Sequence, residues 1–537
     1  MSVFRIAIIW LVCCLCFSSC DRSISDEFTN SLKSKGSQKN QRTNVLFIVA
    51  DDLNCDLSVY GHPHVKSPNI ARLAAEGVLF ENAHCQYPLC GPSRASFMTG
   101  MYCDQTKVED NNVFLRSAIP DVITLGQRFR QQGYRSVRIG KIFHYDNPSA
   151  IGTSGADDGY TWDQTINPYG RDKFEEYKIN TLLPRRYGGT LSWMASGGED
   201  SEQTDGIGAL EAVDMINEFA ETGDNFFLAL GFFRPHTPFV APEKYFDLYT
   251  ADDLDVPESS DEYLRSLPEP ARRSIRAKAS QLDLAIPLAQ EIQRAYYATI
   301  SFVDAQVGVV LDALEASGLR ENTLVVLVSD HGYHMGEHGH WQKQTLFNNA
   351  TRVPLIIAPP GGESLSKRTD TPVELVDLYP TIMDFVGIET PDHVVGRSLV
   401  PIVRSKEINV RESALTKWRK GYSVCTKNYR ITRWGKYGEL GVELYDRRHD
   451  PNELENLASN PHYSGVLDSL RVVLESRVEE CKRLPIGIGR QFSGVGPHNK
   501  APNITPGDYF DTNGNQYFFR SDSALVPPSE IFDEYQE

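Results

Sequence analysis

Asp51, Asp52, Asp330 and His331 are the residues whose types and spacing first suggest chemistry in this 537-residue chain. Each pair directly follows a short apolar run. The pairs supply mainly carboxylate oxygens, which suit Ca²⁺ or Mg²⁺ better than zinc. A paired aspartate could instead cap a helix, but two acidic strand ends at one edge would repel each other without a cation. The sequence therefore predicts one divalent-cation site, with Ca²⁺ and Mg²⁺ as alternatives.

The elements that must position these residues are two apolar runs, Val45–Ala50 and Leu324–Ser329. Unbroken apolar runs of this length are typical of parallel strands buried on both faces, and ligands bind at the carboxyl ends of such strands. The sequence predicts further strands at 136–139, 226–230 and 354–358, and helices at 70–76, 123–132 and 303–314. Strands that alternate with helices indicate an α/β fold with a doubly wound, mostly parallel sheet.

The pattern changes after residue 405, where short strand-like runs follow one another. They lie at 414–418, 421–426, 429–434 and 443–445, and their spacing predicts a small antiparallel sheet in a C-terminal α+β subdomain. We therefore expect a catalytic domain at 44–405 and a smaller subdomain at 406–537, since the chain is too long for one compact core. Segment 251–291 is charged and interrupted by prolines, which predicts a surface position, and the Gly- and acid-rich segment 196–205 predicts a mobile loop near a pocket.

The N-terminus predicts export. A basic start, the apolar run 6–17 and the small residues Ser18-Ser19-Cys20 are typical of a signal peptide over residues 1–20. The ending resembles a bacterial lipobox with Cys20 as the lipidated residue, although Phe17 departs from that pattern and leaves ordinary cleavage as an alternative. Residues 21–43 read as a flexible tether. The expected location is the periplasm or the outer membrane as a lipoprotein, or secretion, with membrane contact only through this lipid anchor.

The net charge of −17 argues against a nucleic-acid partner, which would need a basic surface. It does not exclude a polyanionic substrate, because a bound cation and a few local basic residues can make one pocket positive. Six of the ten cysteines lie outside the signal. If Cys90 is modified, five remain and at least one thiol is unpaired; Cys85 and Cys103 could form a bridge, which the sequence alone does not establish.

Cys90-Gly91-Pro92-Ser93-Arg94 resembles the formylglycine site of the type I sulfatases. The resemblance implies an alkaline-phosphatase-like fold and oxidation of Cys90 to 3-oxoalanine by a formylglycine-generating or anaerobic maturation enzyme, after which the aldehyde hydrate attacks sulfur. It also implies that Asp51, Asp52, Cys90, Asp330 and His331 hold the metal and that Arg94 holds the modified side chain. Without the resemblance, Cys90 could simply be a small buried residue.

Other residues match family positions and take their expected roles from that likeness. Lys141 and Lys343 would contact the sulfate, His144 would act as the base, and His236 would contact the leaving-group oxygen. Many sulfatases have Asn where this chain has His331, whereas the iduronate-2-sulfatase branch has His. The run from 332 to 341 also resembles that branch; any or none of its three histidines, His334, His338 and His340, could face substrate.

The implied activity is hydrolysis of a carbohydrate sulfate ester, on a 2-O-sulfated uronic acid in a polysaccharide such as ulvan or a glycosaminoglycan. Trp162, Trp193 and Trp341 could stack on sugar rings or be buried. One alternative is phosphate mono- or diester hydrolysis, since the alkaline phosphatase superfamily shares the fold, although the zinc ligands of those enzymes are not apparent. Another is a non-catalytic lipoprotein that binds sulfated glycans.

Overall fold

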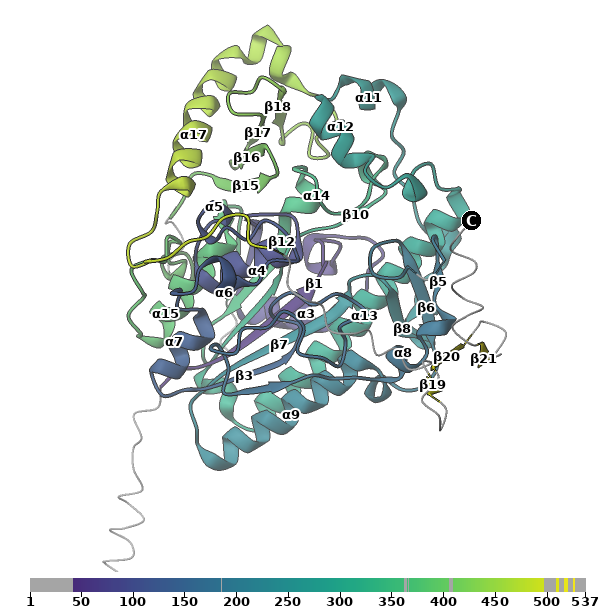
Figure 1. The fold of residues 1–537 in the computed structure, drawn as a ribbon, viewed down its shortest axis with the longest axis vertical. Coiled ribbons are helices and arrows are strands. Elements are labelled where there is room, and N and C mark those ends of the chain that lie inside the picture. Colours follow the sequence, from purple (N-terminus) through teal and green to yellow (C-terminus); the bar gives the residue numbers. More distant parts are fainter. Residues whose placement is uncertain are drawn as a thin grey trace, which may run out of the picture. The chain divides into compact units, whose positions relative to one another are not determined.

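The computed structural model describes residues 42–184, 186–361, 365, 367–404 and 409–496, and the backbone of 509–510, 516–519 and 525–526. The predicted signal peptide and nearly all of the tether therefore lie outside the described residues. Within this part of the chain, the central sheet has the strand order β13-β2-β12-β9-β1-β7-β3-β4, and β14 pairs with β2 (Figure 1). Its strands are β1 (Asn44–Asp51), β2 (Val78–His84), β3 (Arg135–Gly140), β4 (Gln164–Ile166), β7 (Phe226–Pro235), β9 (Thr323–Ser329), β12 (Arg352–Ala358), β13 (Lys367–Thr369) and β14 (Val373–Glu374).

The sheet is mostly parallel, as predicted. The strands β9, β1, β7, β3 and β4 run parallel to one another. The predicted strand at 354–358 is present as β12, but it runs antiparallel to both β9 and β2. An apolar run specifies burial and not direction, so the sequence could not show this reversal.

Helices cover both faces of the sheet, which confirms the doubly wound α/β fold. On β1, Leu46 and Ile48 face one core with α3 (Pro68–Glu76), α9 (Thr204–Thr222) and α13 (Ile286–Ala316). The alternate residues Val45 and Phe47 face a second core with α4 (Cys90–Thr99), α7 (Leu125–Gln131) and α15 (Leu378–Val386). The alternation follows from the two-residue period of a strand.

α13 is long and apolar enough to cross a membrane by length and composition, but 78% of its most apolar window is buried inside the protein. It packs against α9, α3 and β7, so it is a core helix of this fold.

The C-terminal region contains the expected antiparallel sheet, in the order β15 (Ala414–Trp418), β16 (Gly421–Cys425), β17 (Tyr429–Trp434) and β18 (Gly441–Asp446). The helix α17 (Ser464–Lys482) packs on it through Leu470, Leu474 and Val478. The chain from Thr43 on forms one compact unit, and its division at residue 405 stays a prediction.

Glu374, which is fully buried, ties this sheet to the rest of the fold. Its carboxylate accepts hydrogen bonds from the Tyr102 hydroxyl, the Leu415 backbone N–H on β15 and the Arg477 guanidinium on α17. Arg411 lies 2.8 Å from the same carboxylate. A buried carboxylate with several charge-assisted partners is costly to leave unpaired, so the C-terminal sheet is an integral part of the folded chain.

Two segments that the sequence places at the surface also contribute buried residues. The segment 196–205 ends in the first residues of α9, where buried Asp205 accepts hydrogen bonds from the backbone N–H groups of Phe233 and Arg234, both at 2.9 Å. The segment 251–291 includes buried residues such as Ala271, and it sends Lys278 to the candidate site. Its polar composition hid these inward-facing positions.

The remaining helices are α5 (Cys103–Thr106), α6 (Leu115–Ala118), α8 (Arg171–Phe174), α10 (Glu243–Phe246), α11 (Asp261–Ser266), α12 (Glu269–Ile275), α14 (Asn348–Thr351) and α16 (Val400–Arg404). Two small sheets combine β5 (Asn180–Thr181), β6 (Ser192–Ser196) and β8 (Phe239–Pro242), and β10 (His334–Met335) and β11 (Trp341–Gln342). Backbone strands β19 (Tyr509–Phe510), β20 (Gln516–Phe519) and β21 (Leu525–Val526) form a third.

Candidate active site

Four neighbouring parallel strands end at one edge of the sheet and deliver the candidate residues there. Ala50 on β1 pairs with Ser329 on β9, so Asp51-Asp52 and Asp330-His331 emerge side by side. On the other side of β1, β7 leads into His236, and β3 leads into Lys141 and His144. The shared register brings together residues up to 280 positions apart because carboxyl ends of parallel strands meet at one edge.

The turn from β3 into Lys141 depends on a glycine. Gly140 has φ +68°, and a Cβ there would lie 2.1 Å from the carbonyl oxygen of Gly231 on β7. Only glycine takes this conformation at so close an approach without strain.

Cys90 is the first residue of α4 and is fully buried. Its Sγ lies 3.2 Å from His331 Nε2, 3.5 Å from Lys343 Nζ and 3.9 Å from Asp52 Oδ1. α4 begins at this point with Pro92 in its first turn, where the missing N–H costs no helix hydrogen bond, and ends at Gly100 in the left-handed conformation. The start of the helix favours negative charge beside Cys90.

Arg94, one turn along α4, holds the acidic strand ends together. Its Nε donates to Asp330 Oδ2 at 2.8 Å and its Nη2 to Asp51 Oδ1 at 3.0 Å. Its Nη1 donates to the carbonyl oxygens of Lys141 and Ile142 at 2.7 and 2.9 Å. The planar guanidinium, with its five N–H donors, suits these four acceptors better than an ammonium would. In this structure Arg94 therefore contacts the aspartates, whereas the resemblance implied contact with the modified Cys90.

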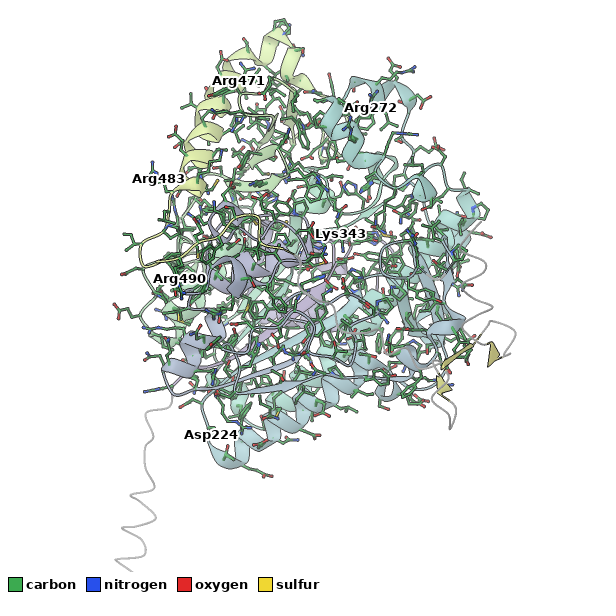
Figure 2. All side chains as sticks on the ribbon, viewed as in Figure 1. Asp224, Arg272, Lys343, Arg471, Arg483 and Arg490 are labelled. Carbon is green, nitrogen blue, oxygen red and sulfur yellow. The ribbon has the colours of Figure 1, made fainter. Side chains whose placement is uncertain are left out.

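Two lysines, together with Arg94, neutralise the negative charges of the aspartates. Lys141 Nζ lies 2.5 Å from Asp51 Oδ2, and Lys343 Nζ lies 2.5 and 2.8 Å from the two oxygens of Asp52. The repulsion between acidic strand ends that the sequence predicts is thus offset by basic side chains of the chain itself. Lys141 is fully buried on Asp51, while Lys343 (labelled in Figure 2) also lines the open cavity described below.

These neighbouring charges shift the pKa values of the two adjacent aspartates in opposite directions. Burial acts to raise the pKa of Asp51, but Lys141, His236, Arg94 and Lys343 together hold it well below its ordinary value. Burial and the neighbouring charges of Asp51 and Asp330 raise the pKa of Asp52, against the opposing effect of Lys343. Burial also raises the pKa of the Cys90 thiol well above 9, so the unmodified side chain is a neutral thiol and a poor nucleophile.

A cavity of about 470 Å³ opens onto this cluster, within the size range of ligand pockets. Of the residues expected to bind or act on substrate, His144, His236 and Lys343 line it, whereas Cys90, Arg94 and Lys141 do not. Sequence reasoning missed Lys278 and Arg186, which also line it. Neither residue lies in an apolar-periodic segment, so no local pattern marks them.

The two cavity histidines are neutral in this structure. Burial lowers the pKa of His144 to about 4, although the hydrogen bond with Asp146 acts the other way. His144 Nε2 lies 3.4 Å from Asp146 Oδ1, and its Nδ1 is buried without a hydrogen-bond partner. Burial and Lys343 lower the pKa of His236, whose Nδ1 donates to the Thr237 carbonyl and whose Nε2 lies 3.7 Å from Asp52 Oδ2.

The three histidines whose role the sequence left open do not line this cavity. His334 contacts the Thr345 hydroxyl, His338 contacts the Tyr263 hydroxyl, and the His340 ring lies between the carbonyl oxygens of Ile275 and Lys343. They support the hairpin that presents Lys343. Trp162 and Trp341 are buried, Trp193 is half-buried, and none lines the cavity.

The donor atoms fit a divalent cation. Asp51, Asp52, Cys90 and His236 offer ligand atoms within 4.8 Å of one another, and Cys90, Asp330 and His331 do the same. Three carboxylates favour a hard cation, and oxidation of Cys90 would replace its sulfur with oxygen, which favours such an ion further. Lys343 holds Asp52 in this structure, so a divalent cation bound to Asp52 would compete with an ammonium group of the chain.

The backbone around the cluster carries three non-glycine residues in the left-handed region: Asp52 at φ 64°, Gln342 at 98° and Gln344 at 73°. Such conformations cost energy and gather at active sites. Here Gln342 and Gln344 flank Lys343, and Asp52 is the ion-pair partner of Lys343. Cys85 and Cys103 are both free thiols, so the bridge that their positions allowed is not formed.

Comparison with known proteins agrees with this geometry. Residues 43–388 match the family model described as Sulfatase, and residues 336–480 match that described as N-sulphoglucosamine sulphohydrolase, C-terminal. A protein described as a sulfatase from Formosa agariphila is 34% identical over 453 residues, covering 81% of this chain and 86% of that protein. Iduronate 2-sulfatase from Homo sapiens is 30% identical over 486 residues, covering 73% and 84%.

Among solved structures, a phosphonate monoester hydrolase from Silicibacter pomeroyi aligns with a TM-score of 0.69 at 24% identity, covering 82% of this chain and 96% of that one. At this identity the likeness concerns the fold. It confirms the alkaline-phosphatase-like α/β architecture expected from the sequence.

Proposed function

From the premise that this chain belongs to the sulfatase family and is a sulfuric ester hydrolase, we propose that it removes sulfate from a sulfated uronic acid of a polysaccharide. The observation that carries the proposal is the meeting of Cys90, Asp52, His331 and Lys343 at one sheet edge, beneath a cavity of about 470 Å³. The human relative named iduronate 2-sulfatase supports the sugar class. A 2-O-sulfated uronate of ulvan or a glycosaminoglycan fits this proposal.

An acidic sugar is favoured by cationic side chains of the cavity that would not contact the sulfate group. Lys278 Nζ donates to the Gly189 carbonyl at 2.6 Å and to the Gln342 side chain, and it forms no ion pair with any described carboxylate. Arg186 lines the same cavity and is exposed. A uronate carboxylate, which lies across the sugar ring from the sulfated C2, would give these charges a partner.

The nucleophile in this proposal is an oxidised Cys90. The modification would supply an aldehyde hydrate, one hydroxyl of which attacks sulfur while the other later loses its proton to release sulfate. The raised pKa of the buried thiol supports the need for such a change, because little thiolate is present at neutral pH. Arg94 would fix Asp51 and Asp330 around the modified side chain.

The cavity residues would bind the sulfate and move protons. Lys343 Nζ, at the border of cluster and cavity, would hold sulfate oxygens from one side. His236 is neutral, and its Nδ1–H donates a hydrogen bond to the Thr237 carbonyl oxygen. Its Nε2 must therefore gain a proton before it can protonate the leaving oxygen. A bound anion favours that protonation. His144, neutral at pH 7, can accept the hydrate proton.

A divalent cation, Ca²⁺ or Mg²⁺, would be held by Asp51, Asp52, Asp330, His331 and the modified Cys90. When bound, it would supply positive charge that polarises the sulfate ester. The residues of the chain would keep that site in place: Arg94 orients two of the aspartates, and the backbone N–H groups of Asp52 and His331 donate to Asp330 Oδ1 at 3.2 and 3.1 Å.

Two measurements test the proposal. Mass spectrometry of the Cys90 peptide, from protein matured by its own formylglycine-generating or anaerobic enzyme, should show the aldehyde. Sulfate release should then be measured on defined oligosaccharides that carry sulfate at C2 of a uronate, at C6 of a hexosamine or on nitrogen. We expect preference for the first; equal or greater release from the hexosamine sulfates would contradict the sugar class.

The alternatives predict other outcomes of the same assays. A phosphate ester hydrolase, or a phosphonate monoester hydrolase as one structural neighbour is named, would turn over an aryl phosphate or phosphonate better than an aryl sulfate. A non-catalytic glycan-binding lipoprotein would bind the oligosaccharides without release of sulfate even when Cys90 is oxidised.

We also propose export to the periplasm or cell surface, on the basis of the signal-like segment 1–20 and the tether 21–43. Metabolic labelling with palmitate, compared between the full chain and a Cys20→Ala variant, tests the lipid anchor. Label that persists in the variant would contradict lipidation at Cys20.

A further inference from the structure

A second cavity continues from the catalytic one. It has a volume of about 630 Å³, and Gln344 lines both cavities. Ala277 lines the second cavity and its neighbour Lys278 lines the first. A third hollow, of about 790 Å³, shares Glu269, Arg273 and Ala277 with the second. We call the second and third cavities together the basic trough.

The trough is built where the C-terminal sheet meets α12. The β15–β16 turn supplies Arg419 and Lys420, the end of β17 supplies Trp434, and α12 supplies Arg273. In the third hollow, Arg265, Arg272 and Arg276 line the wall together with Asp261; Arg272 and Lys343 are both labelled in Figure 2. Two elements far apart in sequence thus form one surface that begins at the catalytic cavity.

The lining of the second cavity carries a net positive charge, although the protein as a whole is negatively charged. Its charged lining consists of Arg273, Arg419 and Lys420 against one carboxylate, Glu269, while the whole chain carries a net charge of −17. Arg273 pairs with Glu269 at 3.2 Å. Arg419 and Lys420 are exposed and form no ion pair with any described acidic side chain. Their charges are available to a ligand.

Arg419 is also held in a costly backbone conformation, with φ at 50° in a tight turn. Asn or Gly would occupy such a position with less strain. Its guanidinium lies 5.0 Å from the centre of the Trp418 ring, which packs edge-to-face on Tyr87 at 5.2 Å. The Trp434 indole N–H donates to Glu443 at 2.6 Å. Trp418 and Trp434 are themselves buried, so the turn presents an exposed cation above a packed aromatic base.

We propose that the basic trough binds the further acidic sugars of a polymeric substrate, next to the sugar that loses its sulfate. Repeating carboxylates and sulfates match the row of cations. Elsewhere the negative protein repels a polyanion, so the trough also orients the chain toward Cys90. The inference rests on the proposed function for the identity of the polymer, but the binding itself can be tested without turnover.

The test uses the double variant Arg419→Asn/Lys420→Gln, which removes both charges and relieves the left-handed strain, so its thermal stability should not fall. The matched control is Lys427→Gln/Arg471→Gln, which removes the same number of positive charges outside the trough. Lys427 lies in the β16–β17 turn and Arg471 on α17. Substrates are 4-nitrocatechol sulfate, a 2-O-sulfated uronate disaccharide and a hexasaccharide that ends in this disaccharide.

We expect the trough variant to raise KM for the hexasaccharide about tenfold and to leave the disaccharide and the aryl sulfate within about twofold. The control variant should leave all three unchanged. The hexasaccharide advantage should also shrink between about 0.05 M and about 0.2 M salt in the unaltered enzyme. Equal effects of the two variants, or equal losses on all substrates, would overturn the inference.

A binding measurement separates this inference from the proposed function. Calorimetry with inactive Cys90→Ala protein, in the original and trough-variant backgrounds, should show weaker hexasaccharide binding only in the latter. If no probe releases sulfate but this difference persists, the trough stands and the proposed function fails. Equal affinity of both proteins, or tighter binding of single-stranded DNA of the same charge than of the hexasaccharide, would overturn the trough as a sugar site.

Discussion

The guanidinium of Arg94 donates to the carboxylate of Asp330 at 2.8 Å, and neither side chain is exposed to solvent. The same guanidinium reaches Asp51 at 3.0 Å, so one side chain on α4 joins the ends of β9 and β1. Arg94, one helical turn after Cys90, thus fixes the geometry of the candidate metal ligands. The Cys90 motif therefore has a structural role as well as a chemical one.

Replacement of Arg94 by Gln should destabilise the fold by about 3–5 kcal/mol, because buried carboxylates lose their cation. Urea unfolding in the absence of added metal measures this loss. Arg72→Gln removes an exposed ion pair with Asp312 at 2.6 Å and should change stability far less. Equal effects would show that the Arg94 pairs contribute no more than surface pairs.

Lys343→Met should tighten binding of Ca²⁺ or Mg²⁺ by about tenfold while turnover falls at least about a hundredfold. The reason is that Lys343 Nζ holds Asp52 at 2.5 Å and competes with a divalent cation for it, yet the same ammonium is needed for sulfate. Calorimetric titration with each ion measures affinity independently of activity. Lys343→Arg, which keeps the charge, should not tighten binding; unchanged affinity in both variants would refute the competition.

Lys278 should make substrate affinity depend on pH. Burial and the nearby Lys343 lower the pKa of Lys278 to about 8, so the ammonium form is present below that pH and is lost above it. KM for an acidic sugar substrate should therefore rise as pH increases through 8, while KM for an aryl sulfate that carries no carboxylate should not.

Two variants make the Lys278 assignment specific. Lys278→Arg keeps its charge to much higher pH and should abolish the rise in KM, whereas Lys278→Gln should give a high KM at every pH. If the rise persists in Lys278→Arg, another group is responsible.

His144→Gln should lower kcat by about 10²–10⁴-fold if the imidazole takes the hydrate proton. Because the pKa of His144 lies at about 4, the base is available at neutral pH, and kcat should fall only as pH decreases toward 4. The pH profile of kcat checks both points. His62→Gln, at a half-buried histidine that does not line the cavity, should leave the profile unchanged.

Much of the architecture and the site could be predicted because buried parallel strands leave a clear signature. The apolar runs before Asp51 and Asp330 specified burial on both faces, and parallel neighbours must end at one edge. No such rule gives the direction of β12, since its apolar run would look the same either way. Nor does any local pattern reveal that Arg94 forms ion pairs with Asp51 and Asp330, because these pairs depend on the alignment of β1 with β9 in the folded sheet.

The residues that sequence reasoning missed share one property: they lie in segments without hydrophobic periodicity. Lys278 sits in a polar, proline-interrupted stretch, and Arg419 sits in a two-residue turn. Their importance comes from which cavity they line, and that is fixed by packing between distant elements. A basic residue in a surface-like segment has no feature in sequence that separates it from a solvated one.

The anchoring of β15 and α17 through buried Glu374 has a consequence for how such enzymes could diversify. One wall of the trough is carried by a rigidly attached sheet, yet two of its cations, Arg419 and Lys420, sit on a turn that supplies no residue to the catalytic cavity. Changes in the β15–β16 turn can therefore retune which polymers are accepted, while the sheet edge that breaks the ester stays as it is.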